Sequence, residues 1–139
     1  MTRTELKNLA RQRLKDAEAL YHTGNYDGCF YLCGYVVELA LKARICKVLN
    51  LDEYPEKGFR GAFKTHDLRE LKILAGLSRA LIPSHPLSGL YQNWITVLDW
   101  SPETRYSPVG TITQPKALDL LDAVRSKPNG IFTWLKKRW

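Results

Sequence analysis

The 139-residue chain has few cysteines and no long apolar run. These two features argue against a disulfide-rich protein and against a membrane-spanning one. The three cysteines, Cys29, Cys33 and Cys46, fall in one apolar segment. An odd number in a helix-like segment argues against a disulfide framework and predicts a reducing, cytoplasmic compartment. The N-terminal residues contain no apolar signal core. The longest uncharged apolar run stops before Glu38, well short of the roughly 18 residues that a membrane span needs.

The motifs of several enzyme classes are also missing. The chain has no Gly-rich phosphate loop of the Walker or dinucleotide type and no Ser-centred nucleophile motif. These absences argue against an ATPase, a dehydrogenase and a hydrolase of that kind. Cys29 and Cys33 stand one helical turn apart, but neither His66 nor His85 has ligand-like spacing to another donor. We expect the cysteines to be core residues, and we expect neither a metal nor a cofactor.

What the chain has in excess is positive charge. It carries 21 Lys and Arg against 14 Asp and Glu, which gives a net charge of +7. This excess favours a polyanionic partner such as nucleic acid or nucleotide phosphates. A hydrophobic content of 45% predicts one compact domain over residues 1–139.

Apolar residues recur at spacings of three and four, which is typical of amphipathic helices. Thr2 and Glu5 have capping-box spacing at the start of the first helix, and Gly24 ends it. The second helix, beginning at Asn25 or Asp27 and running to residue 50, is apolar on nearly every face. It is therefore predicted to be the central, buried helix.

The remaining sequence predicts shorter helices and no strand. A loop over residues 51–64 precedes a helix that begins at residues 65–68, with Asp67 and Glu70 in its first turn. Further helices are expected over residues 87–98 and from Pro115, and a short basic tail follows residue 130. The fold class is therefore all-α, an up-and-down helical bundle of five to six helices.

Four segments carry a family resemblance. Residues 24–28 read GNYDG, residues 31–43 read YLCGYVVELALKA, residues 65–68 read THDL and residues 100–106 read WSPETRY. In this order they resemble the HEPN superfamily of small helical domains associated with nucleotides and RNA. The resemblance implies a helical bundle, often a homodimer, that frequently works beside a small nucleotidyltransferase in toxin–antitoxin pairs.

The resemblance also implies a catalytic possibility, because many members are metal-independent ribonucleases with an Arg-x(4–6)-His motif. Arg60 and His66 match this spacing, as do Arg79 and His85. A neutral imidazole at a helix N-terminus can take a proton from a ribose 2′-hydroxyl, while Arg60 and the free amides of the first turn hold the phosphate. The product would be a cyclic phosphate. The alternative is that His66 is a capping or packing residue.

Three further residues are candidates for the site: one acidic residue in the second helix and two neighbouring residues in a loop. Glu38 lies in the most apolar helix, where an ionised carboxylate requires a partner, and Lys42 is one turn away. We expect Glu38 to be structural, although it can also line a polar pocket or a dimer seam. Arg105 and Tyr106 match a feature of the family and can meet phosphate and base, or anchor a loop.

The first predicted helix carries a basic stripe. Its members follow one another every four residues: Arg3, Lys7, Arg11 and Lys15. The stripe is either a solvated face or a track for an RNA backbone. Two functions follow from these residues. The chain is a module that binds RNA or nucleotide and acts with a partner, or it is an endoribonuclease of toxin or defence type.

Overall fold

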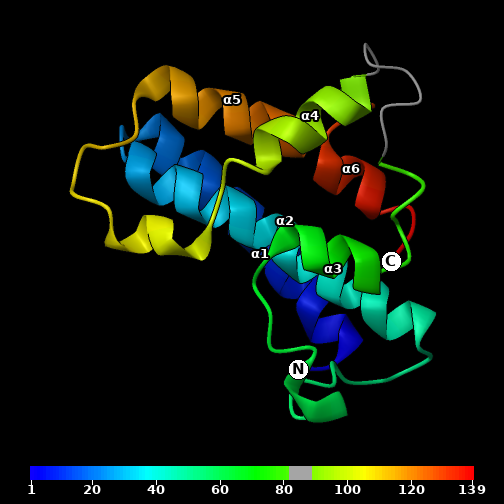
Figure 1. Cartoon of the computed structure of the whole chain (residues 1–139). Helices are drawn as coiled ribbons and strands as arrows, with labels where there is room; N and C mark the ends of the chain where they lie inside the picture. The colour runs from blue at the N-terminus through cyan, green and yellow to red at the C-terminus, as the bar shows by residue number, and fades with distance from the viewer. Residues whose placement is uncertain (82–88) are drawn as a thin grey trace.

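A computed structural model gives the fold of the chain and describes residues 1–81 and 89–139 (Figure 1). All helices and turns within these ranges belong to an all-α bundle, as the sequence predicts, and the one β-bridge joins Thr2 to Glu53. His85 and Leu87 lie outside the described residues. The described part has six α-helices and two 3-10 helices: α1 (Arg3–His22), α2 (Tyr26–Val48), η1 (Phe59–Gly61), α3 (Leu68–Leu74), α4 (Gly89–Val97), η2 (Pro102–Tyr106), α5 (Gln114–Arg125) and α6 (Ile131–Leu135).

Helix α1 begins and ends as its sequence predicts. The Thr2 hydroxyl oxygen accepts a hydrogen bond from Glu5 N at 3.2 Å, and Thr2 N donates to Glu5 Oε2 at 2.7 Å. These two bonds form the capping box. Gly24 follows the end of the helix with a φ of 79°, which costs glycine little.

Helix α2 is the central element of the bundle. It packs against α1, α3, α5, α6 and η2, and Figure 1 shows α1 and α2 side by side through the middle of the molecule. Its buried residues come from all sides of the helix, in agreement with the prediction of a buried helix. The helix ends at Val48, two residues earlier than predicted, and Asn50 then adopts a φ of 53°.

The third helix begins within the predicted residues 65–68, but the place predicted for Asp67 is wrong. Helix α3 begins at Leu68, and Asp67 is its N-cap rather than a residue of its first turn. The Asp67 carboxylate accepts from Arg69 N at 2.7 Å, while Asp67 N donates to the Thr65 hydroxyl oxygen at 3.1 Å. Thr65 therefore closes a turn before the helix, and Asp67 caps the helix itself.

The prediction of a basic tail after residue 130 is also wrong. Residues 131–135 form α6, which packs against α2 and α5. Ile131, Phe132, Leu135 and Trp139 are all buried. Because these apolar side chains follow the three-and-four spacing of a helix, the C-terminal segment completes the core.

Candidate active site and nucleic-acid interface

A buried carboxylate anchors the most distinctive polar cluster of the structure. Glu38 on α2 is 1% exposed, and its Oε1 atom accepts a hydrogen bond from Lys42 Nζ at 2.8 Å. The same oxygen lies 2.7 Å from His66 Nδ1. The ion pair with Lys42 is the one that a spacing of four residues predicts, and it offsets the cost of burying the charge.

The contact with Glu38 also fixes the chemistry of His66. A carboxylate can only accept hydrogen bonds, so Nδ1 of the imidazole carries the proton in this contact. The side chain of His66 is 57% exposed, which leaves it open to a ligand from solvent. A carboxylate that holds Nδ1–H orients the ring, and in the neutral form of the imidazole Nε2 is then the proton acceptor. The arrangement is therefore that of an oriented general base.

A cavity of about 130 Å³ lies beside this pair. Tyr35, Tyr54 and Glu56 line it together with Glu38, Lys42 and His66. The Tyr54 hydroxyl donates to Phe63 O at 2.9 Å, and burial followed by the charge of Glu38 raises the Tyr54 pKa. The same two causes raise the pKa of Tyr35. Both phenols therefore stay protonated at neutral pH, and proton transfer in this cavity falls to the imidazole.

Arg60 lies apart from this cavity. It is an exposed residue of η1, with a φ of 54° and a ψ of 29°, followed by Gly61 at a φ of 80°. The residues that line the cavity beside His66 do not include Arg60. The structure therefore holds His66 through Glu38, and the partnership of Arg60 with His66 stays a prediction.

The backbone amides at the start of α3, which we expected to bind a phosphate, are hydrogen-bonded within the protein. The Asp67 carboxylate accepts from the amides of Arg69 and Glu70 at 2.7 and 3.4 Å. A carboxylate on these amides satisfies them and repels a phosphate. The expectation that the first-turn amides are free to hold a phosphate is therefore wrong.

The basic stripe on α1 consists of Arg3, Lys7, Arg11 and Lys15, and we call it the α1 cationic stripe. Lys7 Nζ lies 5.5 Å and Arg11 Cζ 4.9 Å from the centroid of the Trp139 ring. Burial, followed by the charges of Arg3, Arg11 and Lys47, lowers the pKa of Lys7. Across the ranges that the structure describes, no member of the stripe makes an ion pair. Positive charge is therefore concentrated here without neutralisation.

Arg105 and Tyr106 lie on η2, which packs against α2. Tyr106 is 72% exposed, and Arg105 Cζ lies 4.8 Å from the centroid of its ring. Hydrogen bonding to the Tyr31 side chain, followed by the charge of Tyr106, raises the pKa of Arg105. The structure thus presents both predicted residues to solvent beside α2, at a different place from the α1 cationic stripe.

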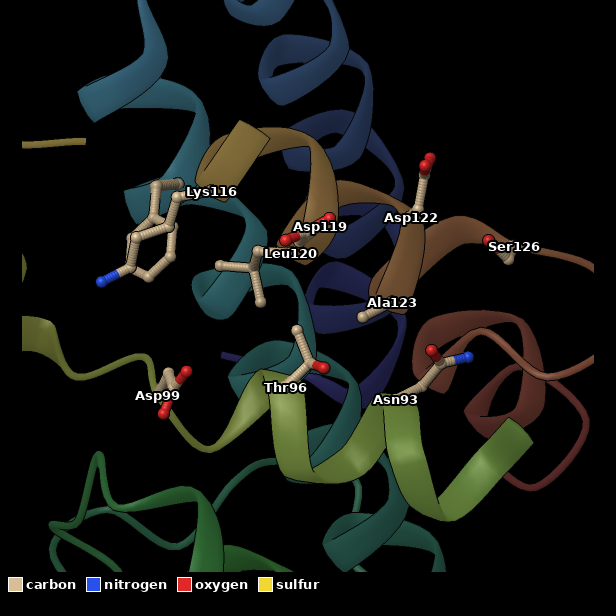
Figure 2. A pocket seen from close by; sticks show the side chains of 10 residues that line it. Asn93, Thr96, Asp99, Lys116, Asp119, Leu120, Asp122, Ala123 and Ser126 are labelled. Atoms are coloured by element: carbon tan, nitrogen blue, oxygen red, sulfur yellow. The ribbon is translucent and has the colours of Figure 1, made fainter. Parts of the chain in front are cut away.

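A groove between α4 and α5 contains none of the predicted site residues (Figure 2). Its volume is about 400 Å³, and Asp99, Asp119, Asp122 and Lys116 are among the residues that line it. Figure 2 shows Thr96 on α4 pointing towards α5. Asp122 is paired with Arg125 at 3.2 Å, which leaves two carboxylates against the Lys116 ammonium, and this balance disfavours phosphate in the groove.

These elements define a small all-α domain with a carboxylate-oriented histidine and exposed cationic surfaces. The family model for the HEPN domain matches residues 4–126, nearly the whole chain. The chain therefore belongs to the HEPN family, as the segments around GNYDG and THDL predict. No match was found among curated proteins or among solved structures. Membership of the family supports a role connected with nucleotides or RNA, and no helix of the described ranges is long and apolar enough to cross a bilayer.

Two of the contacts at the site could not be found from the sequence. Glu38 and His66 are 28 positions apart, and no local spacing relates them. Arg105 and Tyr31 are likewise brought together only by the packing of η2 on α2. The sequence predicts only that Glu38 has a partner, because a carboxylate inside an apolar helix requires one. It does not predict that this partner is His66.

Proposed function

We propose that the chain binds RNA or a nucleotide through the α1 cationic stripe and acts with a partner such as a small nucleotidyltransferase. The observation that carries this proposal is that Lys7 and Arg11 lie 5.5 and 4.9 Å from the centroid of the same Trp139 ring, and that neither is in an ion pair within the described residues. Like charges that are held close without a carboxylate repel one another, and a bound phosphate relieves that repulsion. Release of counterions from the nucleic acid adds a favourable, salt-dependent contribution to binding.

The test is the salt dependence of RNA affinity, measured by fluorescence anisotropy with a labelled single-stranded RNA. The double substitution Arg11→Gln/Lys15→Gln removes two charges of the stripe from exposed positions. We expect weaker binding and a log–log salt slope about 1 to 1.5 smaller in magnitude. The matched control is Lys116→Gln/Lys127→Gln, which removes two exposed charges elsewhere, one of them from the acidic groove. An affinity that does not respond to salt contradicts the proposal.

The proposed assembly is a homodimer that meets the nucleotidyltransferase as a unit. Membership of the family supports this part of the proposal, since these domains often act as dimers. Light scattering over a range of concentrations should give twice the chain mass of 16.0 kDa. A nucleotidyltransferase encoded beside this gene should copurify with the chain when the two are coexpressed. A chain that stays monomeric at every concentration contradicts the dimer.

The second candidate function is a metal-independent endoribonuclease of toxin or defence type that uses Arg60 and His66. It is favoured by the contact between Glu38 and His66, which leaves Nε2 of an exposed imidazole as the proton acceptor. His66 would take the proton of a ribose 2′-hydroxyl, and the 2′-oxygen would attack the adjacent phosphorus. The bond from phosphorus to the 5′-oxygen breaks and that oxygen takes up a proton from solvent, giving a 2′,3′-cyclic phosphate and a 5′-hydroxyl. Arg60 would meet the charge that develops on the phosphate.

Cleavage of RNA in the presence of a chelator tests this second function. His66→Ala and Arg60→Ala should each abolish the cleavage, and the product should carry a cyclic phosphate. The controls are His22→Ala, at an exposed histidine at the end of α1, and His85→Ala, and both should retain activity. Equal cleavage by the His66→Ala variant and the unaltered chain would show that the activity does not come from this site.

A further inference from the structure

Two tyrosines extend the face of α2 that carries Glu38. Residues 31, 35, 38 and 42 are spaced by three or four positions and therefore share one side of the helix. The rings of Tyr31 and Tyr35 are almost parallel, with an interplanar angle of 6° and 6.3 Å between their centroids. Both residues are half-buried, so each ring keeps part of its surface open to solvent.

The η2 segment adds a cation and a third ring at one end of this face. The guanidinium of Arg105 lies 4.8 Å from the centroid of the Tyr106 ring and is hydrogen-bonded to the Tyr31 side chain. Within the parts of the chain that the structure describes, Arg105 forms no ion pair with a carboxylate. Its charge is therefore free to meet a phosphate, while the Tyr106 ring, 72% exposed, is free to meet a base.

His66 lies at the other end of the same face. Tyr35 lines the cavity of about 130 Å³ that Glu38 and His66 also line. The distance along α2 from residue 31 to residue 38 is about 10 Å, at a rise of about 1.5 Å per residue. This is the length of about three stacked nucleotides at about 3.4 Å each. Rings, guanidinium and imidazole therefore follow one another over a length that suits a short stretch of RNA.

We propose that Tyr31, Tyr35, Arg105 and Tyr106 form a stacking surface for single-stranded RNA that leads the strand to His66. The inference rests on the proposed function and names its substrate class. Bases stack on aromatic rings and on guanidinium planes whatever their sequence, but only when they are not paired in a duplex. This surface is separate from the α1 cationic stripe, which offers charge to any polyanion. The stripe supplies salt-dependent affinity, and the stacking surface selects unpaired bases.

The experiment compares three RNA probes of equal length by fluorescence anisotropy: a 12-nucleotide oligoadenylate, an abasic 12-mer with the same phosphates, and a 12-base-pair duplex. Tyr106→Ala should weaken oligoadenylate binding about fivefold or more, which corresponds to the lower end of measured stacking energies. Binding of the abasic 12-mer and the duplex should not change. Tyr106→Trp should restore the affinity for oligoadenylate, because an indole ring stacks as well as a phenol ring does.

A second readout reports stacking directly. An oligoadenylate with 2-aminopurine at one position should lose fluorescence on binding to the unaltered chain, and Tyr106→Ala should reduce that loss. The matched control is Val109→Ala, at a fully exposed residue three positions further along the same loop, and it should behave as the unaltered chain. Because Tyr106 and Val109 are both exposed, neither substitution removes core packing.

The outcomes separate this inference from the proposed function. One outcome is that the unaltered chain binds all three probes with the same salt-dependent affinity and that Tyr106→Ala changes none of the three affinities. The inference of a stacking surface is then wrong, while the proposed RNA binding stands. Equal weakening of duplex and oligoadenylate binding by Tyr106→Ala overturns the inference in the same way. If no probe binds at any salt concentration, the proposed RNA binding falls and the stacking surface falls with it.

Discussion

The indole ring of Trp100 lies directly on the backbone of Gly34 in the middle of α2. A Cβ atom added at Gly34 would stand 2.0 Å from Cδ2 of that ring. The Trp100 Nε1–H also donates to Tyr31 O at 3.0 Å, so the ring is fixed at its far side. Gly34 therefore allows the segment between α4 and η2 to close over the central helix.

Gly34→Ala should destabilise the protein by about 2 kcal/mol or more. The added methyl group overlaps a large, hydrogen-bonded ring, and overpacking of this kind outweighs the gain in helix propensity from Gly to Ala. The measurement is urea unfolding followed by tryptophan fluorescence. The control is Gly28→Ala, whose Cβ would meet only the flexible Leu20 Cδ1 at 3.1 Å and should change stability by less than about 1 kcal/mol. Equal effects of the two substitutions would contradict the role of Trp100.

Asp27 should make the stability of the fold depend on acid. Its carboxylate accepts from Ile112 N at 2.8 Å and from Gly110 N at 2.6 Å, and these two bonds lower its pKa. A carboxylate with a depressed folded-state pKa stabilises the protein above its unfolded-state pKa, and that stabilisation is lost as the pH falls through the folded-state value. Asp27→Asn should therefore cost about 1 kcal/mol at pH 7, since the group is partly open to solvent, and less near pH 3.

Urea unfolding at several pH values checks this prediction. Asp119→Asn is the matched control, because Asp119 is an exposed carboxylate of α5 without a hydrogen bond to the loop at residues 110–112. Its effect should be within about 0.5 kcal/mol at every pH. A constant difference between Asp27→Asn and the unaltered chain from pH 7 to pH 3 would show that the two amide bonds do not depend on the charge.

The three thiols should be inert in the folded protein. Cys29, Cys33 and Cys46 are fully buried. The hydrogen bond between Cys29 and Cys33 lowers the pKa of Cys29 and raises that of Cys33, and burial raises the pKa of Cys46. Burial of all three sulfur atoms, Cys29 included, keeps a reagent from reaching them. A thiol-reactive chromogenic disulfide should therefore label almost no cysteine in buffer and all three in concentrated urea. Rapid labelling of one thiol in buffer would reveal an opening of α2 that the packed bundle does not show.

The helices could be predicted where the signals were local. The capping box of Thr2 and Glu5 marks the start of α1, and Gly24 marks its end, each within a few residues. Pro115 lies in the first turn of α5, as expected. The start of α3 could be predicted only to within residues 65–68, because Thr65 and Asp67 can both cap a helix and only the folded geometry selects Asp67. Helix α6 was missed because the five residues between Gly130 and the basic residues that start at Lys136 give too short a pattern.

The site could also be predicted only where its contacts are local in the sequence. The pair of Glu38 and Lys42 follows from a spacing of four within one helix. The contact of Glu38 with His66 depends on the path of the loop over residues 51–64, which has no periodicity. Asp27 is similar, since its partners are 83 and 85 positions away. Contacts of this kind are set by the packing of the whole bundle.

The buried pair of Glu38 and Lys42 gives the sharpest test of the core of the site. Glu38→Ala leaves the Lys42 ammonium buried without its carboxylate and should cost about 3 kcal/mol or more. Glu38→Gln keeps the shape and one acceptor oxygen but loses the charge, so its cost should be smaller. The double variant Glu38→Gln/Lys42→Met removes the unpaired ammonium and should recover much of the stability lost in Glu38→Ala, since apolar groups can replace a buried ion pair. Urea unfolding of the three variants measures these differences, and a cost of Glu38→Ala below about 1 kcal/mol would mean that water reaches the Lys42 ammonium and that the pair is not buried as the structure shows.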